Sequence, residues 1–480
     1  MSTATIVISD LHIGAGPLDD CDAELERCLL DFLADIGSAG SPVELVINGD
    51  FLDFAQAPPW KGKDLEAVTP LGIPLCFTQE QSLAKLEAIC NDHSSVFAAL
   101  AHFLAVKVDN RLVINPGNHD ADFFWPQVRE QFINKICSEN PKLKAQIFLN
   151  LEQVYHPNSL PSVWIEHGNQ YDPTNCFFVD EYDATIGTHA GKRLYWDAHN
   201  PPILKDQTGQ ERLYECLGTR FLIKYLNKLD SNYPFVDNVK PFSRFLRIFG
   251  VSALRGGYGP IKASVAIWGI LRYLLGSLIT DPQGFLNAER REGNPTASLL
   301  LGALQKLSSD QRKSFTTKLR EAGFCADRPL TMYLQDVELS NSLLEFLSED
   351  IDLLDGFPVF EKSYLDSSSI SASSGYLTLV NAYDVDETKA LKGVAKNLIG
   401  REGLTTVIMG HTHEPVCDLP HARYINTGSW TRYYRIGDNK IRSWDILRTD
   451  SHELFPYQLN YAEIPPGHET ARMETYASKS

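Results

Sequence analysis

The feature that most constrains this chain is a short apolar run that leads directly into Gly-Asn-His-Asp. Residues 111–115 are predicted to form a β-strand, and a Pro-Gly pair then ends the strand and turns the chain. The strand therefore brings Asn118, His119 and Asp120 to an edge of a sheet, where open α/β sheets bind their ligands.

Four further β-type runs end in the same way, most of them beside a glycine. Each one alone has a plain explanation, such as a helix cap, but the repetition predicts that all five ends build one site. Asp10 and His12 are two residues apart, so their side chains point to the same side if the strand continues. The four runs and the polar residues at their ends are residues 4–9 with Asp10 and His12, residues 43–48 with Asp50, residues 163–167 with His167, and residues 405–409 with His411 and His413.

The five strand ends together supply two carboxylates, one amide oxygen and as many as five imidazoles. This mixed set fits two divalent ions of borderline softness, such as Mn, Fe, Zn, Co or Ni, better than Mg or Ca, which prefer oxygen ligands. A carboxylate can bridge two ions about 3.5–4 Å apart, and such a pair clamps a phosphoryl oxygen and an attacking hydroxide.

The order of the predicted elements divides the 480 residues into a core, an insert and a tail. Strand and helix patterns alternate in residues 1–180 and 384–462, which predicts one α/β domain. Residues 181–383 are mostly helical in pattern, with Gly and Pro breaks, and are expected to form an inserted helical cap domain. Residues 463–480 are polar and are expected to form a frayed tail.

Composition narrows the class of protein. The formal charge of −17 argues against a general nucleic-acid binder, whose surface would be basic. The nine cysteines are odd in number and form no Cys-x-x-Cys pair, so neither a disulfide framework nor a structural zinc site is expected. With no signal-peptide pattern and no apolar run of about 18 residues, a cytoplasmic location is expected.

In this order, the motifs Asp-x-His, Gly-Asp-x-x-Asp, Gly-Asn-His-Asp, His-Gly and Gly-His-x-His resemble the calcineurin-like metallophosphoesterase family. The resemblance covers residues 1–180 and about 384–435. It implies the family's four-layer αββα sandwich of two mixed sheets, with two metal ions above the strand ends. It also implies a metal-dependent phosphoesterase that hydrolyses phosphodiester or phosphomonoester bonds, with manganese the metal most expected to support activity in vitro.

The resemblance also implies a role for each motif residue. A hydroxide shared by the ions would attack phosphorus in line, while His119 would stabilise the phosphoryl charge or protonate the leaving oxygen. Asp120 would orient His119, and Asp53 is expected to support a neighbour or cap a helix. One ion would be held by Asp10, His12, Asp50 and His413, and the second by Asp50, Asn118, His167 and His411.

Asn169 and Asp172 follow His167 closely, so they are candidate substrate contacts, and a purely structural role in their loop is an equal alternative. In the insert, residues 238–280 contain no Asp or Glu but six Lys or Arg. This basic and apolar stretch is suited to an anionic membrane surface or a greasy pocket. A buried helical hairpin with snorkelling Arg side chains is the other interpretation.

Residues 167–172 and 424–430 also resemble the bacterial UDP-diacylglucosamine hydrolases, which hold acyl chains with a helical cap. Those enzymes tend to carry Arg where this chain has His119, and their caps are shorter. The alternative enzyme is therefore a pyrophosphohydrolase of a nucleotide-linked lipid, peripheral to a membrane. The alternative of another class is a metal-binding scaffold without catalysis, which would be favoured by missing ligands. None is missing here.

Overall fold

The structure is a computed structural model, and the predicted cap domain falls largely outside the residues that it describes. Apart from positions 317 and 320, the described residues end at 240 and resume at 387, so the basic stretch 238–280 lies almost wholly outside them. The described residues are 3–59, 67–68, 74–157, 160–172, 175–183, 188–193, 197–230, 233–240, 387–417, 423–435, 444–448 and 453–477.

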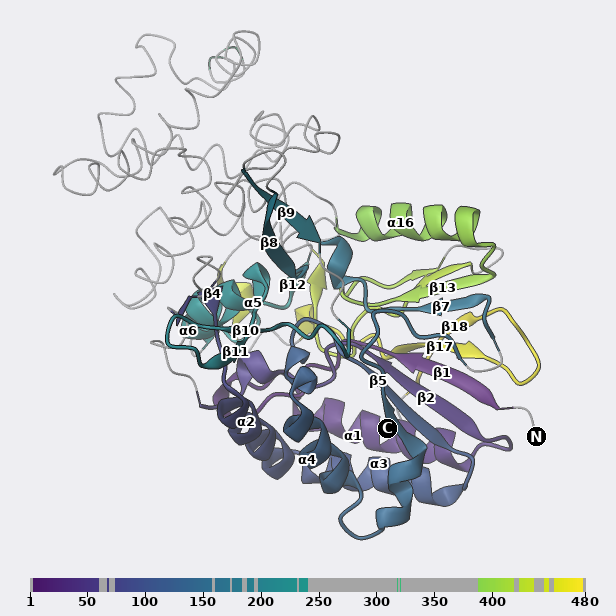
Figure 1. Ribbon diagram of the computed structural model, residues 1–480. Helices are drawn as coiled ribbons and strands as arrows, with labels where there is room; N and C mark the ends of the chain where they lie inside the picture. Colours follow the sequence, from purple (N-terminus) through teal and green to yellow (C-terminus); the bar gives the residue numbers. More distant parts are fainter. Residues whose placement is uncertain are drawn as a thin grey trace, which may run out of the picture.

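Two β-sheets form the centre of the molecule (Figure 1). The larger sheet has six strands in the order β18-β17-β1-β2-β5-β6, of which β1, β2, β5 and β6 are parallel. The smaller has four strands in the order β14-β15-β13-β7. The bounds are β1 Ala4–Ile8, β2 Val43–Asn48, β5 Arg111–Asn115, β6 Ile147–Leu149, β7 Val163–Ile165, β13 Thr406–Met409, β14 Val416–Cys417, β15 Tyr424–Asn426, β17 Asn460–Ile464 and β18 Arg472–Thr475.

Alternation along β1 shows how the larger sheet is packed on both faces. Ile6 and Ile8 join the core on the helical side, while Val7 between them joins the core that contains Ile408 and Ile425 of the smaller sheet. Successive side chains of a strand point to opposite faces, so the buried run that the sequence shows is a strand covered on both sides.

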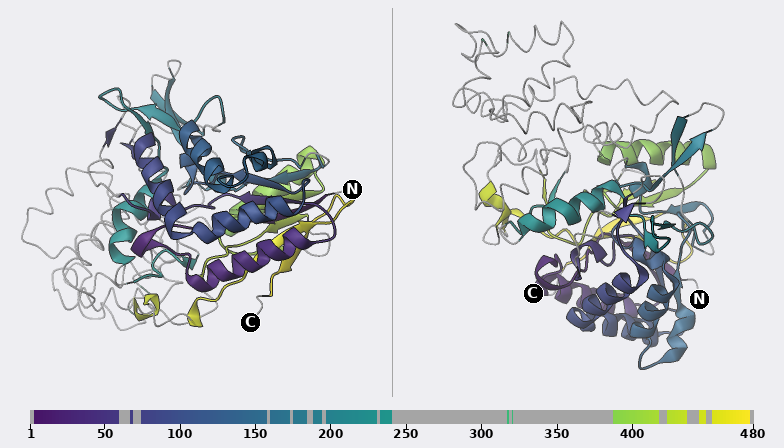
Figure 2. Two further views of the ribbon diagram at one scale, coloured as in Figure 1. Left: turned by 90° about the horizontal axis from the view of Figure 1, so that it is seen from below. Right: turned by 60° about the vertical axis from the view of Figure 1, so that its left-hand side comes forward.

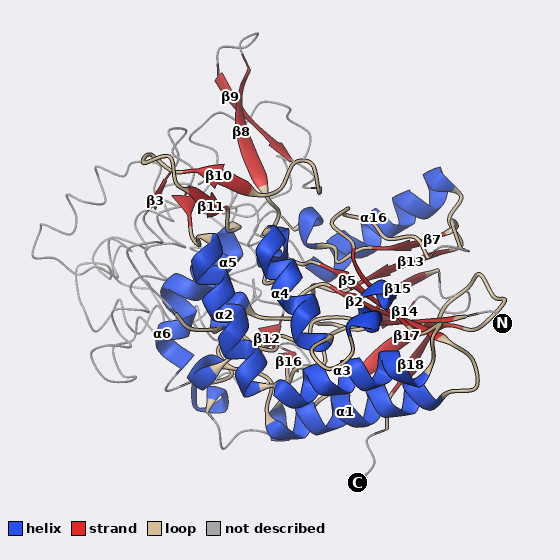
Figure 3. Cartoon of the chain, turned by 60° about the horizontal axis from the view of Figure 1, so that its bottom comes forward, coloured by secondary structure: helices blue, strands red, loops and turns tan. Residues whose placement is uncertain are grey.

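Helices cover the outer face of each sheet (Figures 1 and 3). On the larger sheet lie α1 (Ala23–Ser38), α2 (Gln79–Asp92), α3 (Ser94–Val106) and α4 (Pro126–Ile136). Helix α16 (Glu387–Glu402) packs Leu391 and Ala395 against the smaller sheet, and the right-hand view of Figure 2 also places it opposite α1 to α4. The predicted four-layer αββα fold is confirmed.

Local sequence explains where helix α1 begins and which of its faces is buried. Asp22 begins α1, since its side chain accepts hydrogen bonds from the backbone N–H groups of Glu24 and Leu25. Leu25, Leu29 and Phe32 recur at helical spacing, and all are buried against the larger sheet.

Between β7 and α16 the described chain begins with hairpins rather than helices. The elements are η6 (Asn169–Tyr171), β8 (Phe178–Asp183), β9 (Thr188–Arg193), β10 (Ile203–Lys205), β11 (Glu211–Leu213), α5 (Leu217–Phe221), η7 (Leu222–Leu226), α6 (Asn227–Asp230) and β12 (Val239–Lys240). The helical pattern expected from residue 181 onward is thus wrong for the first part of the insert, where β8 pairs with β9 and β10 with β11. Strand β12 pairs with β16 (Tyr434–Arg435).

The predicted frayed tail is also corrected. Strand β18 pairs antiparallel with β17 and forms an edge of the larger sheet. Arg472 pairs with Glu463 across the two strands, while Ala471 is buried in the core between the sheets. The polarity of this segment reflects an edge strand with one face in water. Among the described residues, no helix is long and apolar enough to cross a membrane.

The shorter elements connect this framework. They are η1 (Gly16–Leu18), η2 (Phe54–Gln56), β3 (Ala67–Val68), β4 (Pro74–Leu75), η4 (Ala121–Phe124), η5 (Pro141–Gln146) and η9 (Trp444–Leu447).

Candidate metal centre

The backbone takes an uncommon conformation at most of the predicted ligands. Of the six non-glycine residues with positive φ in the described part of the chain, five are predicted ligands, and Asp and His adopt this conformation more often than most residues. Such strain gathers at functional sites, where the surrounding structure holds it in place. The five are Asp10 (φ 55°), His12 (46°), Asp50 (49°), His411 (70°) and His413 (57°).

The first group of donor atoms lies where β1 and β13 end. Nε2 of His12 faces Nε2 of His413 at 3.0 Å, and the latter atom lies 3.4 Å from Oδ1 of Asp10. Oδ2 of Asp50 is 3.8 Å from Nε2 of His12. All four side chains are buried, so this group can hold one ion shielded from water.

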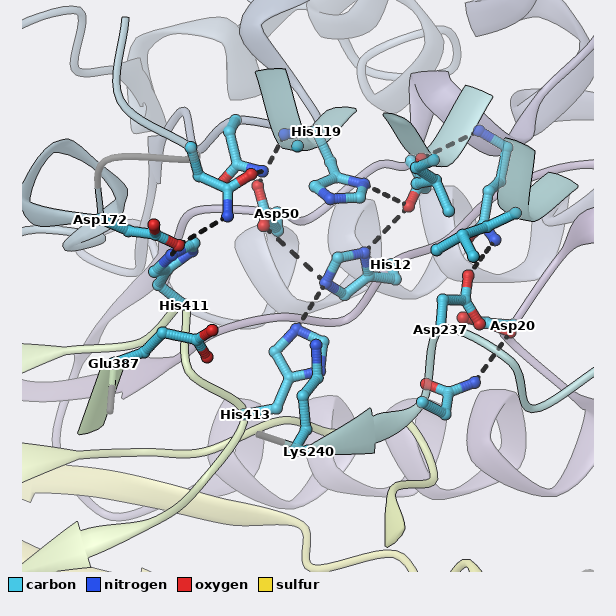
Figure 4. A pocket seen from close by; sticks show the side chains of 18 residues that line it. His12, Asp20, Asp50, His119, Asp172, Asp237, Lys240, Glu387, His411 and His413 are labelled. Carbon is cyan, nitrogen blue, oxygen red and sulfur yellow. Dashed lines mark hydrogen bonds and ion pairs between the residues drawn. The ribbon is translucent and has the colours of Figure 1, made fainter. Parts of the chain in front are cut away.

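The second group shares Asp50 with the first. The ligand atoms of Asp50, His167 and His411 lie within 4.8 Å of one another. Nε2 of His167 is 3.1 Å from Oδ2 of Asp50, the same oxygen that faces His12. Asn118, three residues after the end of β5, is buried and lines the same pocket. Figure 4 shows this pocket. The predicted bridging position of Asp50 therefore agrees with its place between the two groups.

Unsatisfied polar atoms test whether these residues fit metal ions. Among the described residues, Oδ1 of Asn118 and Nε2 of His167 are buried without a hydrogen-bond partner, although Nε2 of His167 lies 3.1 Å from Oδ2 of Asp50. The Nδ1–H of His167 donates to the carbonyl of Asn48 at 3.0 Å, which leaves a lone pair on Nε2. A buried acceptor without a partner is costly, and a divalent ion removes that cost. The residues fit such ions.

Two glycines have no side chain where two of the predicted ligands need space. Gly49 has φ +85°, and a Cβ atom there would overlap the His167 ring. A Cβ atom on Gly117 would overlap Oδ1 of Asp50. Glycine at these turns lets two backbones approach the ligands closely.

His119 is paired with Asp53 rather than with Asp120. Oδ2 of Asp53 lies 2.7 Å from Nδ1 of His119 and 2.9 Å from Nδ1 of His12, so a single carboxylate positions both rings. Its other oxygen accepts from the backbone N–H of Gln56, the last residue of η2, so Asp53 caps the start of that short helix. The expectation that Asp53 supports a neighbour or caps a helix agrees with both contacts.

The predicted role of Asp120 is corrected by its hydrogen bonds. Its carboxylate accepts from the backbone N–H groups of Phe51 at 2.9 Å and of Gly117 at 2.5 Å. Asp120 therefore fixes the turns after β2 and β5, and it orients His119 only through the backbone. Sequence proximity suggested the pairing, but Asp120 faces back into the fold while Asp53 arrives from the neighbouring strand end.

Charge in the pocket follows from this geometry. Burial opposes the charge on His119, but Asp53 and Asp50 outweigh it and raise the pKa of His119 to about 10. Burial, helped by the Lys240 ammonium, lowers the pKa of His413 to about 3, which keeps that imidazole neutral and able to bind a metal. Burial opposes ionisation of Asp50, but His167 and His119 reverse this effect and hold the pKa of Asp50 well below its usual range.

The two candidate substrate contacts have different places. Asp172 lines the pocket, and its Oδ2 lies 2.9 Å from Nε2 of His411, which leaves Nδ1 of His411 for a metal ion. Asn169 does not line this pocket; its amide donates to the carbonyl of Asn175 at 3.0 Å, within the same loop. This contact favours the structural alternative for Asn169.

Sequence reasoning missed several residues that share the pocket. Asn175, Asp237, Lys240 and Glu387 line it together with the predicted ligands. The last three are labelled in Figure 4. Lys240 was visible only as one cation of a basic stretch, and no motif marks the other three. They reach the pocket through tertiary folding alone.

Comparison with known families agrees with this geometry. The family described as calcineurin-like phosphoesterase matches residues 4–251, just over half of the chain. The chain belongs to this family. No curated protein and no solved structure matches it. Family membership and the Asp/His groups together support a metal-dependent phosphoesterase in general, whereas nothing in the comparisons supports the narrower likeness to UDP-diacylglucosamine hydrolases.

Proposed function

We propose that this protein hydrolyses P–O bonds of phosphomonoesters or phosphodiesters with two divalent ions, and that manganese supports the reaction in vitro. The observation that carries the proposal is the convergence of both ligand groups on Asp50. When bound, such ions polarise a phosphoryl oxygen and lower the pKa of the attacking water. An insert beside this pocket is proposed to select the substrate.

The chain's own side chains supply the remaining chemistry. Asp53 holds Nδ1 of His119, so the opposite nitrogen, Nε2, is free to approach the substrate. Asp53 raises the pKa of His119 and so favours its protonated form, which can give a proton to the leaving oxygen. The His119 backbone N–H donates to Oδ1 of Asp50 at 2.9 Å, which ties the acid to the bridging ligand.

A phosphoester panel tests the proposal. The full-length protein is assayed with monoesters, diesters and nucleotide pyrophosphates in Mn, Ni, Zn, Mg or chelator. We expect turnover that chelator abolishes and manganese restores. Asp50→Asn should abolish turnover and weaken binding of both ions, because it removes charge from the shared ligand. Asp109→Asn, at an exposed position, is the matched control. An Asp50→Asn enzyme with full activity and two ions would contradict the bridging assignment.

The sequence also motivates a second location for the enzyme, at an anionic membrane surface reached through residues 238–280. The support is the basic and apolar composition of this stretch in an otherwise acidic chain. On this alternative the substrate is a nucleotide-linked lipid. Co-sedimentation with anionic vesicles should fall when Arg244 and Arg247 are both changed to Glu, and unchanged co-sedimentation would remove the support.

A further inference from the structure

Lys240 enters the pocket from a part of the chain that carries none of the family's motifs. It is the last residue of β12, which is held by parallel pairing with β16 and by burial of Val239. The adjacent Asn238 donates a hydrogen bond to Asp20 at 3.3 Å, which fixes the strand from its other side. Figure 4 shows Lys240 beside His413, and both line the pocket with His119.

The charge of Lys240 is directed at the reacting region. Its side chain lines the same pocket as His413 of the first ligand group and His119, the predicted acid, so its ammonium lies at the wall of the space between them. The space between those side chains is where the phosphoryl group of a substrate must lie if His119 is to act on it.

Among the described residues, no carboxylate forms an ion pair with the half-buried Lys240. The pocket contains the carboxylates of Asp20, Asp50, Asp53, Asp172, Asp237 and Glu387. None of them lies within ion-pair distance of Lys240, although the charge of Lys240 acts on Asp237. Ion pairs of Lys and Arg are found elsewhere in the described residues, such as Lys135 with Glu87 and Arg212 with Asp206. An ammonium that lines a pocket and has no ion pair among the described residues can bind an anion that enters the pocket.

We propose that the Lys240 ammonium binds a non-bridging oxygen of the substrate and makes the enzyme prefer phosphomonoester dianions to phosphodiester monoanions. This inference rests on the proposed function and names its substrate class. A lysine ammonium is a compact point charge with three donors, which suits a phosphate oxygen. Coulomb attraction doubles when the ligand charge doubles, so the dianion gains more from Lys240 than the monoanion does.

The experiment compares two substrates that share a leaving group. The manganese-loaded, full-length protein and its Lys240→Ala and Lys240→Arg variants hydrolyse 4-nitrophenyl phosphate and its methyl ester. Lys240→Ala should lower kcat/KM for the dianion about 10-fold to 100-fold, the range for loss of a hydrogen bond to a charged group, and should change the diester far less. Lys240→Arg should recover most of the loss, because it keeps the charge. Lys205→Ala, at the exposed last position of β10, is the matched control.

Calorimetry gives a readout that does not depend on turnover. Inorganic phosphate, at a pH where it is a dianion, should bind the Lys240→Ala protein about 10-fold or more weakly than the wild type. Equal losses on the two substrates, or unchanged phosphate binding, would overturn the inference and leave Lys240 a structural residue. If the wild type hydrolyses neither substrate nor any ester of the panel, the proposed function is wrong, while phosphate binding still tests Lys240.

Discussion

Asp53 is the residue on which the two halves of the pocket depend. One carboxylate oxygen contacts the ring nitrogens of both His12, a predicted ligand, and His119, the predicted acid. It fixes the tautomer of both rings, so each presents its Nε2 atom to the pocket. An imidazole without such a partner can rotate or carry its proton on the wrong nitrogen.

Asp53→Asn is therefore expected to impair chemistry without unfolding the protein. The amide keeps an acceptor for the backbone N–H of Gln56 but loses the charge that holds both histidines. We expect kcat and manganese affinity each to fall about 10-fold to 100-fold, the usual effect of losing a partner behind a metal ligand. Asp206→Asn is the control, because Asp206 also accepts backbone N–H groups but lies outside the pocket. Wild-type kcat in Asp53→Asn would show that the pairing is incidental.

Substitution of Gly49 tests whether the second ligand group depends on the close approach of this backbone to His167. Alanine at this position must adopt φ +85° and must place its Cβ atom against the His167 ring. The strained backbone alone should lower the free energy of unfolding by about 1–2 kcal/mol. Displacement of His167 should in addition weaken binding of the second metal ion. Gly209→Ala is a matched control, since Gly209 has φ +84° with open space around it.

Chemical denaturation and metal titration separate the two costs. Gly209→Ala should lose stability only by the backbone term and keep both ions. Gly49→Ala should lose more and bind one ion instead of two. If the two variants lose equal stability and both keep two ions, the close approach of Gly49 to His167 has no consequence.

At the scale of elements, a buried histidine connects helix α1 to the junction between helices α2 and α3. His93 sits at the junction of α2 and α3, with Nδ1 2.8 Å from Glu26 of α1 and Nε2 2.8 Å from Asp19 of the preceding loop. Burial opposes its charge, but Asp19 and Glu26 outweigh burial and raise the pKa of His93 above its usual value of 6.5. The junction is thus held by an imidazolium between two carboxylates.

This pairing makes stability depend on pH in a defined direction. Because the folded-state pKa is raised, the contribution of His93 is complete below the unfolded value of about 6.5 and is lost as pH rises through the folded value. His93→Gln should lower the free energy of unfolding by about 1–3 kcal/mol near pH 6 and by less at higher pH. His102→Gln, at an exposed position of α3, is the control. A difference that is constant with pH would contradict the ionic pairing.

The elements also show what a sequence can and cannot reveal. Apolar runs allowed β1, β2, β5 and β13 to be predicted, because a strand that is buried on both faces requires such a run. The ligands could then be predicted as well, because parallel strands end at the same edge of a sheet. The partner of His119 was predicted wrongly, since Asp120 and Asp53 are both near it in space and only the direction of each carboxylate separates them. Edge strand β18 was missed because one solvated face gives no apolar run.

At the scale of the whole molecule, the site joins segments from opposite ends of the chain. The backbone N–H of His411 donates to the carboxylate of Asp10, 401 positions earlier in the sequence. His12 meets His413 across the same separation. These contacts lie where the two sheets meet, so ions bound there would hold the first and last parts of the α/β domain together.

Metal binding should therefore stabilise the folded domain as a whole. A ligand that binds only the folded state adds about 2.7 kcal/mol at 100 times its dissociation constant, and added manganese should raise the melting temperature by several degrees. His413→Ala should reduce this shift, because it removes the ligand that the last part of the chain gives to the first group. His468→Ala, at an exposed position, should keep the full shift. An identical shift in wild type and His413→Ala would mean that manganese binds elsewhere.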